Sequence, residues 1–198
     1  MTRAAIAGQR TQRRAQAHAA TRGAILEAAR RVGARDGEMS LRAVAAEAGF
    51  APAALYGYFS GKDDLLLALA AEDMTLLARA MRDASAQAGT QGRLAAAARV
   101  ALSNPGETDS LAGALGALPS QPTARDAERL FNGRLIALLK VLSEASGKPA
   151  AMRGDQCDVV LLAAAVGGLA LLARSGRLDA LGFTTDEILA RLEAHFAA

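Results

Sequence analysis

The 198-residue sequence predicts an all-α protein, on the strength of its composition and the spacing of its apolar residues. Hydrophobic residues make up 52% of the chain, whereas aromatic residues make up only 4%. Alanine and leucine, which favour helices, dominate over the β-branched residues that favour strands. A chain of this length can bury a sizeable core, either as one large domain or as a small and a medium one.

The first predicted helix begins at Thr21, a residue type suited to capping a helix N-terminus. Ile25, Ala29 and Val32 follow at offsets of four and three, so they form one apolar stripe along this helix. The pair Asp36–Gly37 marks its end.

Two short helices joined by a tight turn are predicted next. Ser40 can cap the first of them, and Val44 then faces inward. Gly49 supplies a left-handed turn, which glycine adopts without strain. Pro52 suits the first position of the following helix because the N–H that proline lacks would be unpaired there. Leu55 of that helix points to the core.

Longer helices are expected in the rest of the chain. Ser60 and Asp63 resemble a capping box that opens a long helix linking two domains. Thr184 and Glu187 form the same pattern at the start of the last helix. The helices between these two are expected near residues 91–102, 109–118, 123–145 and 153–173.

Basic residues are concentrated in the first third of the chain. Residues 1–62 hold ten Lys and Arg against four Asp and Glu, a net charge of +6, whereas residues 63–198 have a net charge of −3. A basic domain is suited to a polyanion, because phosphate neutralisation dominates affinity for nucleic acids. The predicted domains are a basic, disordered arm over residues 1–20, a helix-turn-helix DNA-binding domain over residues 21–66, and a helical domain over residues 67–198.

The predicted arm leaves two interpretations open. It carries Arg3, Arg10, Arg13 and Arg14 and no acidic residue. Such a segment is either a solvated tail or a contact to the phosphates or minor groove of DNA.

Several classes of protein are disfavoured by what the sequence contains. Cys157 is a lone cysteine, and the two histidines, His18 and His195, lie at opposite ends of the chain. The apolar run Val159–Ala173 is shorter than the ~20 residues that span a bilayer, and it is interpreted as a buried helix. No catalytic set and no Gly-rich phosphate loop is found. We therefore expect no enzyme, no metal, no cofactor and no membrane contact, and a cytoplasmic location.

Two segments carry a family resemblance. The segment 40–49, SLRAVAAEAG, and the segment 55–65, LYGYFSGKDDL, strongly resemble the tetracycline-repressor (TetR) family in motif and spacing. The resemblance covers about residues 21–66 and extends only loosely to the Leu-rich, Gly-Gly-containing helix around residues 166–172. It implies a homodimer that binds operator DNA and a helical regulatory domain with a small-molecule pocket.

The resemblance carries DNA contacts over to particular positions. Arg42 can contact a guanine edge, Lys62 can contact a phosphate, and tyrosine hydroxyls can donate to phosphate oxygens. Two alternatives stay open: the tyrosines could simply pack in the core, and Arg42 could be a solvated surface charge. The residues that the resemblance implies are Ser40, Arg42, Tyr56, Tyr58 and Lys62.

The predicted recognition helix departs from the commonest family pattern. Ala51, Ala53, Ala54 and Gly57 stand where serine, glycine, threonine and histidine are frequent. Base recognition should therefore be less polar. The methyl groups of Ala53 and Ala54 can contact thymine methyl groups, so both are added to the predicted DNA-binding residues.

The predicted regulatory domain has a candidate pocket and a candidate dimer interface. The resemblance implies an effector pocket, for which Met74, Met81, Phe131 and Met152 are candidates, although apolar residues at helical spacing are usually plain core. The helices near residues 123–145 and 153–173 are expected to pair with their symmetry mates, unless the second is simply the central core helix of each monomer. The candidate dimer residues are Phe131, Leu135, Leu138, Leu142, Ala164, Gly167, Gly168 and Leu171.

The expected function is that of a transcriptional repressor, released from a palindromic operator when a small molecule binds the second domain. A ligand-independent or activating DNA-binding regulator is the first alternative. A helical module that binds a small molecule or a protein without reading DNA is the second.

Overall fold

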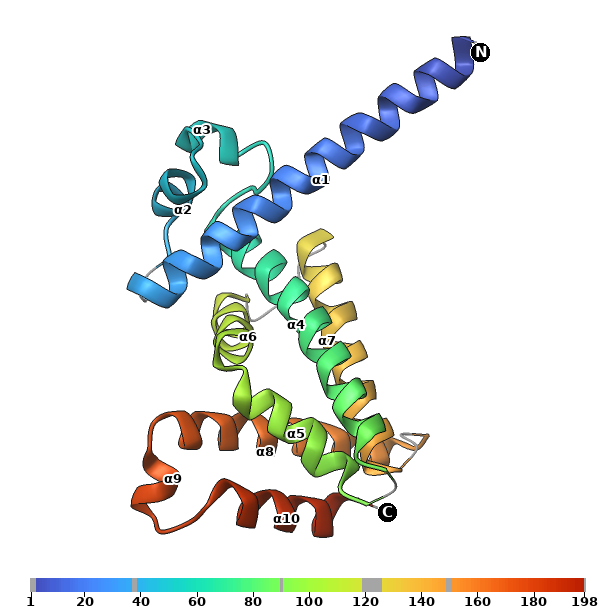
Figure 1. The fold of residues 1–198 in the computed structure, drawn as a ribbon, viewed down its shortest axis with the longest axis vertical. Helices are drawn as coiled ribbons and strands as arrows, with labels where there is room; N and C mark the ends of the chain where they lie inside the picture. The colour runs from blue at the N-terminus through green and yellow to red at the C-terminus, as the bar shows by residue number, and fades with distance from the viewer. Residues whose placement is uncertain (1–2, 37–38, 90, 119–125, 149–150, 198) are drawn as a thin grey trace. The chain divides into compact units, whose positions relative to one another are not determined.

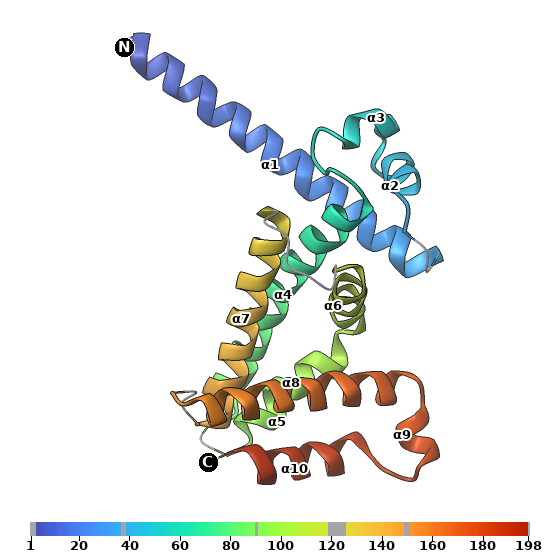
Figure 2. The same ribbon diagram turned by 180° about the vertical axis from the view of Figure 1, so that it is seen from behind.

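The computed structural model describes residues 3–36, 39–89, 91–118, 126–148 and 151–197 (Figures 1 and 2). The chain divides into two compact units, Met1–Leu69 and Ala70–Ala198. Each unit is described by itself.

All regular secondary structure in the described ranges is helical, so the predicted fold class is confirmed. The helices are α1 (Arg3–Asp36), α2 (Leu41–Ala48), α3 (Pro52–Leu55), α4 (Lys62–Gln87), α5 (Arg93–Ser103), α6 (Pro105–Ala117), α7 (Asp126–Ser146), α8 (Arg153–Arg174), α9 (Arg177–Ala180) and α10 (Thr185–Phe196).

The core of the first unit is made by α1, α2, α3 and the first turns of α4. The predicted apolar stripe of α1 is fully buried there, and so are the inward residues of α2 and α3. Close packing of these side chains holds the four helices of the core together. Its buried members are Ile25, Leu26, Ala28, Ala29, Val32, Val44, Ala45, Leu55, Phe59, Leu65, Ala68 and Leu69.

The predicted boundaries of the two short helices are confirmed by their caps. The hydroxyl of Ser40 accepts a hydrogen bond from the backbone N–H of Ala43 at 3.1 Å, so it caps α2. Gly49 ends α2 with φ 75°, in the left-handed region that glycine tolerates. Pro52 occupies the first turn of α3, where its missing N–H costs nothing.

The N-terminal segment differs from the prediction. The expected disordered arm is not found over residues 3–20, because α1 begins at Arg3 rather than at Thr21. The Thr21 hydroxyl donates a hydrogen bond to the carbonyl of Ala17 at 3.0 Å, as a threonine inside a helix does. The alanine and arginine content of the preceding residues favours helix strongly enough to extend it past this potential cap.

The start of α4 also needs a correction. Ser60 is capped by Asp64 rather than by the predicted Asp63: the Asp64 carboxylate accepts from the Ser60 N–H at 2.7 Å and from its hydroxyl at 3.1 Å. The reason is that α4 begins at Lys62, which places Asp64 third in the helix, where a side chain can reach back.

In the second unit, α5 packs against α7, α8 and α10. Figures 1 and 2 show α8 and α10 joined through the short helix α9, which the sequence analysis did not predict. The capping box of Thr184 and Glu187 is confirmed, and the Glu187 carboxylate accepts from the Thr184 N–H at 2.8 Å. The hydrogen bond from the Thr184 hydroxyl, and then the one from its N–H, lower the pKa of Glu187. Residues 123–125 of the helix predicted near residues 123–145 lie outside the described residues.

The C-terminal end of α10 is attached to the start of α5. The Glu193 carboxylate accepts hydrogen bonds from the backbone N–H groups of Gly92 at 3.2 Å and Ala95 at 2.6 Å. Arg99 donates to Asp186 at 2.5 Å between the same two helices. A carboxylate at a helix N-terminus is favourable for both its hydrogen bonds and the helix dipole, so α5 gains the side-chain cap that its own sequence lacks.

Candidate nucleic-acid interface

The predicted DNA-binding residues gather on one surface of the first unit, formed by α2, the turn after it, α3 and the start of α4. The surface is small and carries two cationic side chains and one protruding aromatic ring. Ser40, Arg42, Ala53, Ala54, Tyr56 and Lys62 are exposed, and Tyr58 is partly buried.

The orientation of α3 follows from its one buried residue. Leu55 is fully buried, and Phe59 one turn later is buried beside it in the same core. Because side chains three and four apart share a helix face, Ala53, Ala54 and Tyr56 are turned away from the core. The Tyr56 side chain is 64% exposed, so the alternative that it packs in the core is wrong.

Tyr58 has a structural contact that the sequence analysis missed. Its ring stacks on the His18 ring of α1, with 4.6 Å between ring centroids. One helical turn further along α1, the Arg22 guanidinium lies 5.1 Å from the centre of the Phe59 ring, at cation–π distance. These contacts fix the loop between α3 and α4 against α1, and they leave part of Tyr58 accessible.

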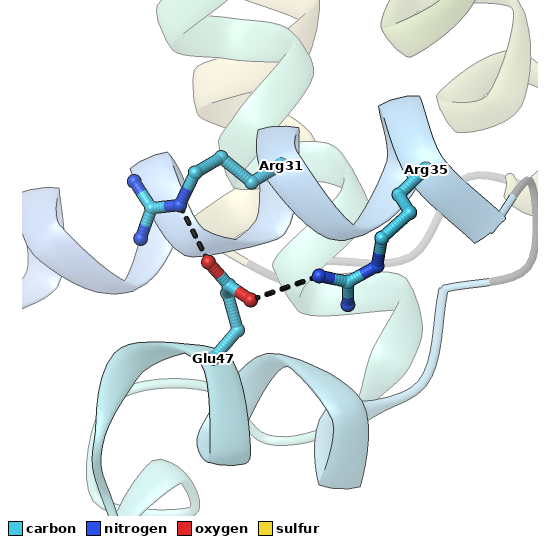
Figure 3. Close-up of polar contacts among 3 residues, drawn as sticks. All are labelled: Arg31, Arg35 and Glu47. Carbon is cyan, nitrogen blue, oxygen red and sulfur yellow. Dashed lines mark hydrogen bonds and ion pairs between the residues drawn. The ribbon is translucent and has the colours of Figure 1, made fainter.

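An ionic clamp holds α2 on α1. The Glu47 carboxylate of α2 accepts from Arg31 Nε at 2.7 Å and from an Arg35 terminal nitrogen at 3.2 Å (Figure 3). The two arginines are one turn apart on α1, so each can take one carboxylate oxygen. Hydrogen bonds from Arg31 and then Arg35 lower the pKa of Glu47. The clamp orients α2, and with it Arg42, although none of its members was predicted to be functional.

The candidate effector residues do not all lie in the interior. Met74, Met81 and Phe131 are buried, as a pocket or plain core both require. Met152 differs from the other three candidates, because it is 74% exposed. It precedes α8 in extended backbone, and its N–H donates to the Asp155 carboxylate at 2.9 Å.

A groove of about 940 Å³ lies between α7 and α8. None of the four candidate effector residues lines it. Its lining is mainly apolar, with charged residues among the apolar ones. The lining includes Ile136, Leu139, Val160 and Leu161, with Lys140, Glu144 and Arg153.

The candidate dimer residues divide into two groups. Phe131, Leu138 and Leu142 of α7 are buried within their own unit, and Leu135 is partly buried, so this stripe serves the protomer core. The outer face of α7 instead exposes Leu130 and Ile136, which the sequence analysis missed because core and interface stripes share the same helical period.

The candidate dimer residues of α8 are all exposed. Ala164, Gly167, Gly168 and Leu171 lie on its outer face, where Val160 and Leu161 are exposed too. This helix is long and apolar enough to cross a membrane, a property that core helices of soluble proteins share. Only 28% of its most apolar 18-residue stretch is buried. The expectation of a buried helix is therefore met on one face of α8 only, which includes Leu162 and Val166. That the exposed face is a dimer seam stays a prediction.

Over the residues that the structure describes, no group of three or more His, Cys, Asp or Glu side chains could hold a metal ion. Cys157, the lone cysteine, is exposed.

Comparisons with known proteins agree with this geometry. Residues 25–69 match the family described as bacterial regulatory proteins, tetR family. None of the curated proteins compared with the chain matches it. A protein of unknown function from Rhodococcus sp. RHA1 shares 26% identity and a TM-score of 0.65, covering 89% of this chain and 93% of its own.

Two further solved structures share the fold. A TetR family transcription regulator from Marinobacter aquaeolei VT8 has 20% identity and a TM-score of 0.54, covering 90% of this chain and 94% of its own. The TetR-like transcriptional regulator LfrR from Mycobacterium smegmatis, in complex with proflavine, has 24% identity and a TM-score of 0.52, covering 87% and 92%.

The exposed face of α2 and α3 on a basic, all-helical unit defines a helix-turn-helix DNA-binding transcriptional regulator. The match to the tetR family of bacterial regulatory proteins lies in this N-terminal unit, over residues 25–69.

Proposed function

We propose that this regulator binds a palindromic operator as a homodimer in the cytoplasm and that a small molecule bound by the second unit releases it. The observation that carries the proposal is the outward face of the helix-turn-helix unit. Its buried anchor, Leu55, turns Ala53, Ala54 and Tyr56 of one short segment toward solvent together.

In the proposed complex, α3 enters the major groove and α2 braces it across the backbone. Arg42, near the start of α2, donates to a guanine edge or a phosphate, and Lys62 at the start of α4 neutralises a phosphate. Ala53 and Ala54 contact thymine methyl groups, and the Tyr56 hydroxyl donates to a phosphate oxygen. Ser40 already caps α2 through its oxygen, so its hydroxyl hydrogen remains for a phosphate.

The outer face of α8 supports the homodimer. Val160, Ala164, Gly167 and Leu171 are exposed at offsets of four, three and four, which is the spacing of a helix–helix seam. A Cβ built at Gly167 or Gly168 would meet nothing within 4 Å in the protomer, so packing within the chain does not require either glycine. Glycine inside a helix costs about 0.5 to 1 kcal/mol relative to alanine. A symmetry mate that approaches the helix backbone closely would account for both.

Release by a small molecule is supported by the solved complex of LfrR with proflavine and by the apolar interior of the second unit. Regulation of this kind requires two states that differ in affinity for DNA. A coupling of about 1 to 3 kcal/mol between effector and DNA is typical, and it acts equally in both directions. Buried Met74, Met81 and Phe131 are the proposed pocket candidates.

The Lys62→Ala variant tests the docking face. Binding of a 40-base-pair random-sequence duplex is measured by fluorescence anisotropy at several salt concentrations. The slope of log affinity against log salt is negative. Loss of one phosphate contact should make it less steep by about one unit. The matched control is Arg79→Ala, which removes an exposed cation from the second unit and should leave the slope unchanged.

An unchanged slope for Lys62→Ala would contradict the proposed face. A wild-type chain that binds no duplex DNA at low salt would instead support a helical module that does not read DNA.

A further inference from the structure

The N-terminal part of α1 is a cationic helix outside the core. Every residue from Gly8 to Ala20 is exposed, and Ile25 is the first fully buried residue that follows them. Arg10, Arg13 and Arg14 lie in this exposed part. No acidic residue precedes Glu27 in the chain, so the cations here have no acid on their own helical turns.

The arginines continue a face that is already fixed to the recognition unit. Arg10, Arg14 and His18 are four residues apart, so they lie along one row of α1 that turns by about 40° at each step. The row ends at the His18 ring stacked on Tyr58. A rise of 1.5 Å per residue puts Arg14 about 6 Å and Arg10 about 12 Å beyond that stack along the helix axis. Within the first unit, Figure 1 shows this end of α1 projecting past α3.

This arrangement is unfavourable for the chain alone. Arg10 and Arg14 are a like-charge pair at i,i+4, which destabilises a helix slightly. A polyanion beside this row would relieve this repulsion.

A duplex fits better than a membrane surface. The remaining exposed positions of residues 8–20 are mainly alanine, glutamine and threonine, so the segment has no large apolar face to insert into lipid. Double-stranded DNA presents one charge per about 1.7 Å of its axis, so it offers phosphates all along such a helix.

We propose that the N-terminal extension of α1 is a second DNA contact, in which Arg10 and Arg14 bind phosphates flanking the half-site read by α3. The inference rests on the proposed DNA-binding function. In this arrangement Tyr58 connects the segment after α3 with the N-terminal extension of α1, because its ring stacks on the His18 ring.

The test compares three variants of the full chain. Arg10→Ala with Arg14→Ala removes both cations and keeps residues that favour helix. Arg10→Lys with Arg14→Lys keeps the charges. Arg79→Ala with Arg82→Ala removes two exposed cations from α4 in the second unit and is the matched control. Each is titrated against the 40-base-pair random-sequence duplex at 0.1 M and 0.2 M salt.

Loss of two phosphate contacts should make the negative slope of log affinity against log salt less steep by about 1.8 units. The affinity ratio of wild type to the double-alanine variant should therefore change by about 3.5-fold between the two salt concentrations. The lysine variant should behave as the wild type, and so should the control. Circular dichroism checks that helical content is kept.

A double-alanine variant with wild-type affinity and slope would overturn the inference while leaving the proposed function standing. Equal loss in the control would also overturn it, because the effect would then be one of net charge. Wild type that binds no duplex would overturn both. Binding of wild type to vesicles of anionic lipid, lost in the double-alanine variant while DNA binding is unchanged, would assign the extension to a membrane surface and overturn the DNA contact.

Discussion

Replacement of Gly168 by leucine separates a dimer seam from an exposed helix face. Gly168 lies on the outer face of α8, and a Cβ there meets nothing within 4 Å in its own chain. In an isolated protomer the change therefore costs no packing. It should stabilise the helix by about 0.8 kcal/mol, the difference in helix propensity between glycine and leucine.

At a seam between two copies, the same substitution should be destabilising. Added side-chain volume in a close contact typically costs 1 to 3 kcal/mol. Since 1.4 kcal/mol is a tenfold change, the dimer dissociation constant should rise by about 5-fold to 150-fold. Operator affinity should fall with it, because two half-sites are read by one dimer.

Sedimentation equilibrium measures the dissociation constant, and circular dichroism measures helical content and thermal stability. The matched control is Gly113→Leu on α6, where a Cβ also meets nothing within 4 Å. The control should stay dimeric. A Gly168→Leu variant that dimerises as the wild type does and is more stable would refute the seam, and a wild-type chain that sediments as a monomer at micromolar concentration would refute the dimer altogether.

Two other predictions concern the first unit. Arg42→Ala should weaken operator binding and relax preference at one base position by about 1 to 3 kcal/mol, measured by competition among single-base variants of a selected operator; an unchanged preference would place Arg42 on phosphate instead. The lowered pKa of Glu47 stabilises the fold at pH values above the ordinary range of a glutamate, and this contribution is lost as the pH falls through the lowered pKa. Denaturant unfolding should therefore show wild type more stable than Glu47→Gln at pH 6, with a difference that shrinks toward pH 3. A difference that grows as the pH falls would contradict the clamp. Glu187 titrates in the same direction and is common to both proteins, so it cancels in this comparison.

The helix-turn-helix unit could be predicted in detail because its signals are local. The Ser40 cap, the left-handed Gly49 and the position of Pro52 each depend on contacts within four residues. Local signals were less decisive where one residue type fits two positions in a helix. Thr21 can cap a helix or continue one, and the helix-forming residues before it settled the outcome.

The tertiary contacts could not be predicted in the same way. Glu47 meets Arg31 across 16 residues and Arg35 across 12, and nothing in the spacing of these residues distinguishes a clamp from three solvated charges. The stripe of α7 that includes Phe131 and Leu138 shows the same limit. A core face and a dimer face both repeat at the helical period, so only burial separated the inner stripe from exposed Ile136.

Selection of bound DNA from a random duplex pool tests the central claim most directly. The wild-type chain should enrich a palindrome whose half-sites are centred about one helical turn, 34 to 36 Å, or a multiple of it apart. No enriched sequence, or a single asymmetric site without a repeated half, would contradict a dimeric helix-turn-helix regulator.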